Sequence, residues 1–247
     1  MMLNSFGGAF RSAAEFLKTK QSITMKIKIL NLYACLGGNR YKWDEVHDNI
    51  EVTAVEIDEE LARLYKERFP NDAVVVGDAH QYLLDHYKEY DFIWSSPPCP
   101  THSRARFWNS VSDKTATVPV YPDMMLYQEI LFLQHYFKGV YVVENVIPYY
   151  KPLIPGQKRG RHLYWSNFAI PNFKARHIQI SSGKNELHRL CDFHDYNFYQ
   201  YKGCQRLDKI ARNLVDYNAG KIIFKQVVDV ILQKPTKQVG LFESCNF

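Results

Sequence analysis

The stretch from Asp91 to Cys99 reads DFIWSSPPC, an apolar run that ends in two prolines and a cysteine. The large apolar residues Phe92–Trp94 favour a buried strand, and Pro97 and Pro98 end it because proline lacks a backbone N–H and fixes φ. A thiol at a rigid strand end is well placed to attack a substrate, although most cysteines are small buried hydrophobes. Cys99 is therefore a candidate nucleophile that needs supporting evidence.

A second stretch of the same form, VYVVENV, lies at Val140–Val146. Its apolar β-forming residues deliver Glu144 and Asn145 to the carboxyl end of a strand. If the two strands are parallel, this end lies at the same edge of the sheet as Cys99. The sequence thus predicts that a carboxylate and a thiol converge on one substrate.

Strand and helix patterns alternate over residues 26–150. The expected strands are Lys26–Tyr33, Val52–Ile57, Val74–Val76, Asp91–Ser95 and Gly139–Glu144, and the expected helices are Glu59–Phe69, Gln81–Tyr87 and Tyr121–Phe137. This alternation predicts an α/β fold with a doubly wound, mostly parallel sheet that binds its ligands at the carboxyl ends of the strands. The length of 247 residues suits one such body with a small elaboration.

Composition predicts a cytoplasmic protein. Five cysteines without regular spacing argue for a reducing compartment, and no apolar run reaches the ~20 residues of a membrane span. The N-terminus lacks a compact apolar core with a cleavage signal, so we expect no secretion.

Positive charge is concentrated in residues 151–212, which hold 12 Lys and Arg against 4 Asp and Glu. The same window holds nine aromatic residues, among them Tyr164, Trp165, Phe168, Phe173, Tyr199 and Tyr201. This mixture is typical of a surface that follows phosphates and stacks on bases. The alternative is a solvated basic face over an ordinary aromatic core.

Three strand ends suit a nucleoside cofactor. The turn NLYACLGG carries Tyr33, Gly37 and Gly38, the second strand ends at Glu56, and the third at Asp78. Neither the dinucleotide pattern G-x-G-x-x-G nor a P-loop is present, so those two ligand classes do not fit. Each acidic residue alone could instead be a helix cap or a surface charge.

The order NLYACLGG, VEID, GDA, SSPPC, ENV and QKRGR resembles the C5 cytosine-specific DNA methyltransferases, in a compact phage- or bacterial-like form. The resemblance runs from about Lys26 to Arg161 and resumes near Arg212. It implies a Rossmann-like catalytic domain with S-adenosylmethionine as methyl donor. The donor-binding residues that it implies are Tyr33, Ala34, Leu36, Gly37, Gly38, Glu56, Ile57, Asp78, Ala79, Pro98 and Asn213.

The same resemblance implies how the residues act on DNA. Cys99 would add to C6 of a flipped cytosine, Glu144 would bind N3 and the exocyclic amine, and Arg161 with Arg159 would contact the base oxygen. The loop Thr101–Asn109 would close over the base. Its residues Ser103, Arg104 and Arg106 would face the DNA.

Departures from the family leave alternatives open. Tyr33 stands where phenylalanine is usual, and the donor-closing asparagine could be Asn213 or Asn218. The expected organisation is an N-terminal extension at residues 1–24, a catalytic domain at 25–167, a small target-recognition region at 168–205 and a returning C-terminal helix at 206–247. The small target-recognition region predicts a short target sequence.

Other functions remain as alternatives: a tRNA cytosine-C5 methyltransferase, or a non-catalytic DNA-binding relative. A cognate restriction nuclease could be a partner, and the oligomeric state is open. Zinc binding by His188, Cys191, His194 and Cys204 has atypical spacing, so we expect no metal.

Overall fold

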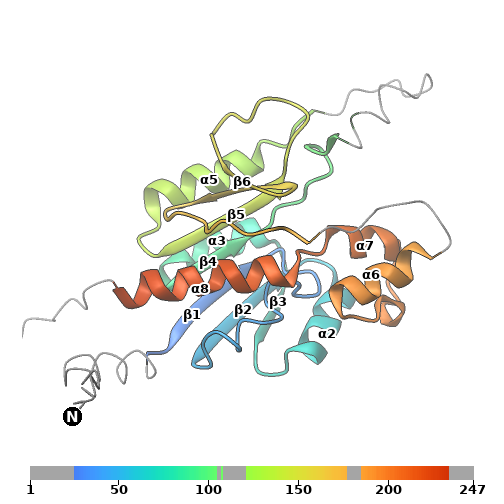
Figure 1. The fold of residues 1–247 in the computed structure, drawn as a ribbon. Helices are drawn as coiled ribbons and strands as arrows, with labels where there is room; N and C mark the ends of the chain where they lie inside the picture. Colours follow the sequence, from blue (N-terminus) through green and yellow to red (C-terminus); the bar gives the residue numbers. More distant parts are fainter. Residues whose placement is uncertain (1–24, 105–106, 108–120, 177–184, 234–247) are drawn as a thin grey trace, which may run out of the picture.

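The computed structural model describes residues 25–104, 107, 121–176 and 185–233, and its centre is a seven-stranded sheet of order β3-β2-β1-β4-β5-β7-β6 (Figure 1). The first five strands pair in parallel, whereas β7 runs antiparallel to both β5 and β6. The strands are β1 (Ile27–Leu32), β2 (Ile50–Glu56), β3 (Ala73–Val76), β4 (Phe92–Ser95), β5 (Val140–Val146), β6 (Gln157–Arg159) and β7 (His162–Ser166). The expected α/β fold with a mostly parallel sheet is confirmed.

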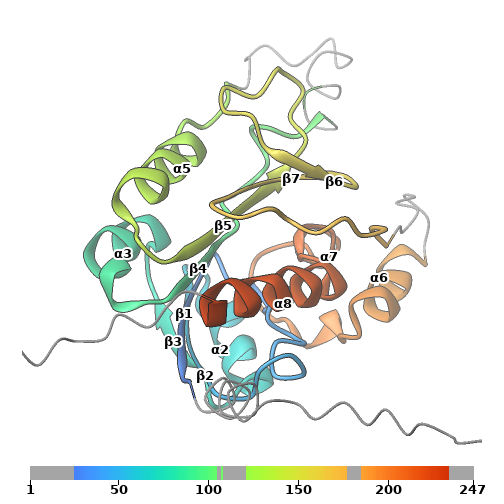
Figure 2. The same ribbon diagram turned by 60° about the vertical axis from the view of Figure 1, so that its left-hand side comes forward.

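Helices cover both faces of this sheet (Figure 2). The helices α3 and α5 lie on one face, and α2 and α8 lie on the other. The helical elements are α2 (Glu59–Arg68), α3 (Ala79–His86), η1 (Tyr87–Glu89), α5 (Met125–Tyr136), α6 (Glu186–His194), η2 (Phe198–Gln200), α7 (Leu207–Asn213) and α8 (Tyr217–Gln233).

The element boundaries agree with the sequence pattern except at a few ends. The helix α5 begins at Met125 rather than Tyr121, and α8 begins at Tyr217, five residues earlier than its apolar pattern indicates. The hairpin of β6 and β7 was not expected, because QKR in β6 carries no apolar alternation. The extension at residues 1–24 and the end of the chain from residue 234 lie outside the described residues.

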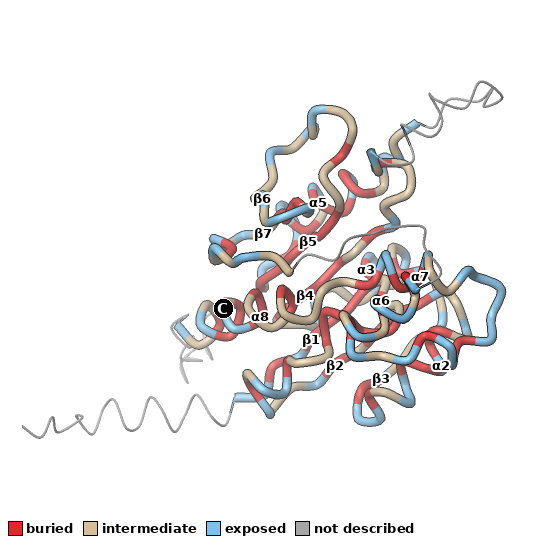
Figure 3. The backbone as a smooth tube through the Cα atoms, turned by 45° about the vertical axis from the view of Figure 1, so that its right-hand side comes forward, coloured by how far each residue is buried: buried red, intermediate tan, exposed pale blue. Residues whose placement is uncertain are grey.

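The core has a layer on each face of the sheet. On one face, Trp43 and Phe224 stack with ring centroids 5.0 Å apart and pack against Phe92 and Trp94 of β4. On the other face, Ile93 packs with Val143 of β5 and with the apolar side of α5. All four residues of β4 are buried (Figure 3), as is typical of a central parallel strand. The strand that leads to Cys99 therefore has little freedom to move.

A third apolar cluster joins α6 and α7 to the body of the molecule. Leu36 of the glycine turn and Leu64 of α2 pack in it with Leu190, Phe198 and Ile210. The described part of the expected target-recognition region thus shares a core with α2. Among the described residues, none of the helices is both long and apolar enough to cross a bilayer.

Candidate active site

Cys99 and Glu144 lie at the carboxyl edge of the sheet, on neighbouring strands. Cys99 follows β4 by four residues and is partly buried, and Glu144 is the fifth residue of β5 and is 7% exposed. Burial and, to a smaller extent, the charge of Glu144 raise the pKa of the Cys99 thiol to about 11, while Lys209 of α7 acts to lower it. The carboxylate and the thiol are thus close enough to interact electrostatically.

Asn145 fixes the loop that carries the cysteine. Its Nδ2 donates to the carbonyl of Pro97 at 3.0 Å, and its Oδ1 accepts from the Val146 N–H at 2.9 Å. Asn145 is almost fully buried at 1% exposure, so these bonds are shielded from water. The asparagine therefore braces the backbone two residues before Cys99 against β5.

The chain after Cys99 is tied to the chain after β5. The Cys99 carbonyl accepts from the N–H groups of His102 and Ser103 at 3.0 and 3.1 Å. Ser103 forms an isolated β-bridge with Pro148, and Arg104 donates from Nε to the Pro148 carbonyl at 3.1 Å. Arg106 lies outside the described residues, so the expected DNA-facing set is described only at Ser103 and Arg104.

The sequence pattern did not single out His162, which faces the same carboxylate. Its Nε2 lies 3.6 Å from Glu144 Oε1, and its ring stays 39% exposed at the start of β7. The pairing of Val146 with His162 places the histidine beside Glu144. A histidine directly after QKRGR was the only signal, and its meaning depended on the unexpected hairpin.

The two arginines of QKRGR differ in position. Arg159 in β6 donates to the carbonyls of Lys158 at 2.8 Å, Pro171 at 2.8 Å and Ile170. It therefore braces the segment after β7. Arg161 is exposed in the β6–β7 turn, and its carbonyl accepts from the Ile147 N–H at 3.2 Å. Their roles on a base remain predictions.

Glu56 spans the first two loops at the same edge. Its Oε2 accepts from the Cys35 N–H at 2.8 Å and its Oε1 from the Asp58 N–H at 3.0 Å. Burial raises the pKa of this carboxyl, which is 8% exposed. Next to it, Ile57 exposes 70% of its surface, so a carboxylate and an apolar side chain stand together at the end of β2.

The glycines of the turn make room for the chain itself. A Cβ on Gly37, where φ is +66°, would meet the rings of Phe69 and Tyr65 at 2.4 and 2.7 Å. A Cβ on Gly38 would meet the Val215 carbonyl at 2.2 Å. At these two glycines the backbone thus lies close to the end of α2 and to the segment that connects α7 with α8.

That segment brings both candidate asparagines towards the turn. Asn213 is exposed at the last residue of α7, directly before Leu214, which packs on Gly38. Asn218 lies in the first turn of α8, two residues before Gly220, which packs on the Asn39 backbone. The geometry does not choose between the two.

The remaining expected donor-site residues also lie at these strand ends. Asp78 is exposed and caps α3 by accepting from the Gln81 N–H at 2.7 Å, and Ala79 behind it is buried. Ala34 and Leu36 are buried in the turn, whereas Pro98 is exposed beside Cys99. Tyr33 is partly buried with its hydroxyl bonded to Glu129 of α5.

The aromatic residues of the basic window are mostly core. Tyr164, Trp165 and Tyr201 are at most 4% exposed, and Phe168 and Phe173 pack against the core, whereas Tyr199 is 53% exposed. The base-stacking interpretation is wrong for the three buried rings, because β7 is covered on both faces and Tyr201 packs in the third apolar cluster. No group of His, Cys, Asp and Glu in the described part of the chain could hold a metal ion.

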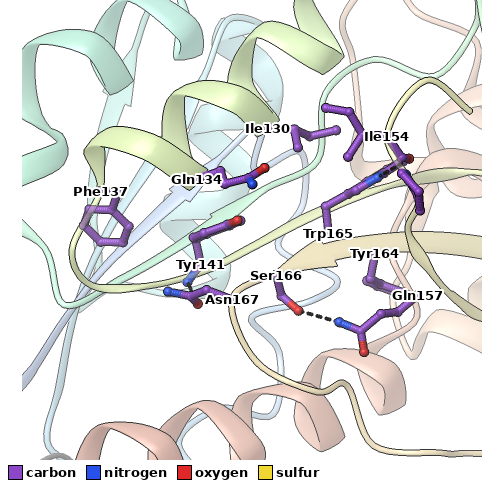
Figure 4. A pocket seen from close by; sticks show the side chains of 11 residues that line it. Ile130, Gln134, Phe137, Tyr141, Ile154, Gln157, Tyr164, Trp165, Ser166 and Asn167 are labelled. Carbon is purple, nitrogen blue, oxygen red and sulfur yellow. Dashed lines mark hydrogen bonds between the residues drawn. The ribbon is translucent and has the colours of Figure 1, made fainter.

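A cleft of about 470 Å³ lies elsewhere, between α5 and the strands β5 and β7 (Figure 4). Tyr141 and Asn167 line it near the amino end of β5, away from Glu144. Two of its polar side chains form hydrogen bonds within the wall: Trp165 donates to the Ile154 carbonyl, and Gln157 to Ser166 Oγ, each at 2.9 Å. Neither Cys99 nor Glu144 lines this cleft.

Several solved structures resemble the chain, with low TM-scores. A hypothetical protein of Thermus thermophilus matches at 18% identity and TM-score 0.36, covering 67% of this chain and 92% of its own. A mutant of Spodoptera frugiperda DNMT2 matches at 25% identity and TM-score 0.34, covering 49% of this chain and 36% of its own. A SAM-dependent methyltransferase from Agrobacterium tumefaciens matches at 16% identity and TM-score 0.37, covering 55% and 44%.

No curated protein matches the chain. The family model of the C-5 cytosine-specific DNA methylases matches residues 27–147, from β1 to the residue after β5. This range contains Cys99, Glu144 and the three loops at the ends of β1, β2 and β3. Residues 27–147 thus match the C-5 cytosine-specific DNA methylase family, which supports a methyltransferase that uses S-adenosylmethionine as methyl donor.

Proposed function

We propose that the protein methylates C5 of cytosine in DNA through a transient bond between Cys99 Sγ and C6 of the base. The observation that carries the proposal is the pairing of Cys99 with Glu144 at one sheet edge, where Asn145 bonds to Pro97. A nucleophile and a carboxylate on a braced loop suit covalent catalysis on a ring that must also be recognised.

The chemistry explains why a thiol and a carboxylate are both needed. C5 of cytosine is a poor nucleophile until C6 is saturated. The Cys99 thiolate gives its electron pair to C6, C5 takes the methyl group, and loss of the C5 proton then expels the thiolate. Glu144 would hydrogen-bond N3 and the exocyclic amine and so stabilise a proton on N3 during attack.

The free protein holds Cys99 mainly as a thiol, since burial and Glu144 raise its pKa to about 11. A base bound to Glu144 places hydrogen-bond donors on that carboxylate, and the negative charge then opposes a thiolate less. Lys209, which lowers the pKa of Cys99, acts in the same direction. Base binding would therefore activate the nucleophile.

The residues at the ends of β1, β2 and β3 fit S-adenosylmethionine. The bound donor supplies a methyl group on a positively charged sulfur. Glu56 would accept from the ribose hydroxyls, the exposed side chain of Ile57 would lie against the adenine, and Asp78 would accept from its amine. The turn from Tyr33 to Gly38 with Ala79, Pro98 and Asn213 would complete the site.

The target base would have to leave the helix, because attack on C6 needs the face of the ring. Ser103 and Arg104 follow Cys99 and lie against Pro148, which suits contacts to the DNA backbone beside the flipped base. The small region of α6 and η2 would read only a few base pairs, so we propose a short target sequence.

Transfer of a labelled methyl group to duplex DNA and to tRNA tests this proposal. We expect label in DNA with the intact chain, none with Cys99→Ala, and unchanged transfer with Cys204→Ala, since Cys204 is exposed in the segment between η2 and α7. Label in tRNA alone would replace DNA by RNA as the substrate. Transfer that survives Cys99→Ala would remove the covalent step.

A further inference from the structure

Glu129 is a carboxylate buried in an apolar layer of the molecule. It lies on the inner side of α5 with Leu126, Ile130 and Leu133, and none of its surface is exposed. An ionised carboxylate without partners in such a place costs several kcal/mol, so its retention calls for hydrogen bonds and a balancing charge.

Three side chains bind the two oxygens of this carboxylate. Ser95 donates from Oγ to Oε2 at 2.6 Å, Tyr33 donates its hydroxyl to Oε1, and His80 Nδ1 lies 3.2 Å from Oε1. We call Glu129, Tyr33, Ser95 and His80 the Glu129 cluster. Each of the three partners lies shortly after, or at the end of, a different strand of the sheet.

The Glu129 cluster connects the donor site with the nucleophile. Tyr33 opens the glycine turn after β1, and His80 follows Asp78 and Ala79 after β3. Ser95 is the last residue of β4, four residues before Cys99, and Pro97 and Pro98 stiffen the backbone between them. A shift of the carboxylate would therefore move both sides of the reaction site.

The conformation of Tyr33 makes such an anchor useful. Its φ is +54°, in the left-handed region that costs a residue with a side chain roughly 1–2 kcal/mol. Burial and Glu129 together raise the pKa of the Tyr33 hydroxyl, so it stays a hydrogen-bond donor at neutral pH. The hydrogen bond to Glu129 thus helps to offset the cost of this backbone conformation of Tyr33.

His80 is the cationic partner of the cluster among the described residues. The hydrogen bond to Glu129 raises the pKa of His80, and Asp78 on its own loop raises it further. Tyr33 also faces Asp78 and Asp123, both acidic. Without a proton on His80, the four residues of the Glu129 cluster and the neighbouring Asp78 and Asp123 carry no positive charge.

We propose that Glu129 is a positioning residue for the methyl donor, fixing Tyr33 at the donor site and Ser95 at the root of the Cys99 loop, with protonated His80 as its balancing charge. The inference rests on the proposed function, because it concerns the same site. It predicts that donor affinity depends on the cluster and on the protonation of His80.

Calorimetric titration with S-adenosylmethionine tests the inference without any catalytic readout. We expect Tyr33→Phe and Glu129→Gln each to weaken binding roughly 5-fold or more. The double variant should bind no more weakly than Glu129→Gln, because the Tyr33 hydroxyl has no carboxylate to bond once Glu129 is replaced. Tyr82→Phe is the matched control, since its hydroxyl meets Tyr90 rather than Glu129, and it should bind as the parent does.

A pH series separates positioning from mere stabilisation. The ratio of parent to His80→Gln affinity should fall as pH rises through the pKa of His80, which the hydrogen bond to Glu129 raises above its usual value, because His80 then loses the proton that balances Glu129. Taking the ratio cancels the titration of the donor's own amino group. A constant ratio, or Tyr33→Phe within twofold of the parent, or losses that multiply in the double variant, would overturn the proposal.

Failure of the donor-site assignment and failure of the role of Glu129 give different results. If the parent protein does not bind the donor, the assignment of the donor site to this edge is wrong. If the parent binds and the variants bind equally well, only the role of Glu129 is wrong. Thermal unfolding of each variant shows that it is folded, and Tyr33→Phe and His80→Gln suffice for the test if Glu129→Gln does not fold.

Discussion

At the scale of single residues, the reactivity of Cys99 is set by its surroundings. A thiol with a pKa of about 11 is almost wholly protonated at pH 8. The same burial that keeps the Cys99 thiol protonated in the free protein also protects it from oxidation and alkylation. In the proposed mechanism, a base that binds Glu144 would activate the thiol.

The first prediction concerns alkylation of Cys99 by iodoacetamide, followed by peptide mass spectrometry. The rate should rise roughly tenfold per pH unit between pH 7 and pH 10, since only the thiolate reacts. Glu144→Gln removes the charge that raises the pKa and should speed the reaction at pH 8. Alkylation of the exposed Cys204 in the same sample is the control for the activity of the reagent. Equal rates at pH 7 and pH 10 would contradict the environment described for Cys99.

A second prediction concerns His194, the last residue of α6. It is 3% exposed, and its Nδ1 has no hydrogen-bond partner among the described residues. Burial lowers its pKa to about 4. The folded pKa lies below the unfolded value of about 6.5, so the unfolded chain binds a proton first and stability is lost as pH falls through this window.

Between pH 7 and pH 5 this linkage should lower the free energy of unfolding by about 2 kcal/mol, as measured by urea unfolding. His194→Phe keeps an aromatic ring beside Phe198 and removes the titrating group. The difference in stability between parent and variant should therefore change with pH. A difference that is the same at both values would show that His194 titrates normally.

At the scale of elements, α2 and its N-cap connect the sheet with the region of α6, η2 and α7. Asp58 caps α2 by accepting from the N–H groups of Glu60 and Leu61, each at 3.0 Å. Its other oxygen accepts from Tyr201 at 2.9 Å and from Gln205 at 2.8 Å. One carboxylate thus starts a helix next to Glu56 and anchors the small region after η2.

The third prediction follows from this double role. Asp58→Ala should lower the free energy of unfolding by about 2 kcal/mol, the sum of a lost helix cap and lost side-chain bonds. Glu59→Ala, on the exposed first turn of the same helix, should change it by less than about 0.5 kcal/mol. Similar effects of the two changes in urea unfolding would show that Asp58 does not join the two parts.

The sequence predicted those parts of the site that follow from strand order. Parallel strands end at one edge, so the apolar runs before Cys99 and Glu144 were enough to expect the two residues together. It could not predict the Glu129 cluster. A carboxylate in LYQEILFL shows that α5 buries a charge, but the partners Ser95, Tyr33 and His80 come from three distant strands.

The burial of side chains in β7 also could not be predicted from the sequence. Tyr164 and Trp165 stand in a basic segment, and only the antiparallel pairing of β7 with β5 shows that both faces of this strand are covered. His162 became part of the site for the same reason, since it pairs with Val146. Hairpins made of polar residues leave no periodic signal in a sequence.

At the scale of the whole molecule, the fold brings the loops after β1, β2 and β3, together with Cys99 and Glu144, to one edge of one sheet. The helices α6 and α7 add a small region at the glycine turn through a shared core. In the proposed function, this edge would hold the donor and the reacting base, and the small region of α6 and η2 would contact DNA.

The most direct test is covalent trapping on duplex DNA that carries 5-fluorocytosine in place of cytosine, with S-adenosylmethionine present. Fluorine at C5 cannot leave as a proton does, so the thiolate cannot be expelled after methyl transfer. The account predicts a denaturation-resistant protein–DNA adduct whose peptide mass maps the bond to Cys99, and no adduct with Cys99→Ser. An adduct that persists in Cys99→Ser, or none with a chain that binds both donor and DNA, would contradict it.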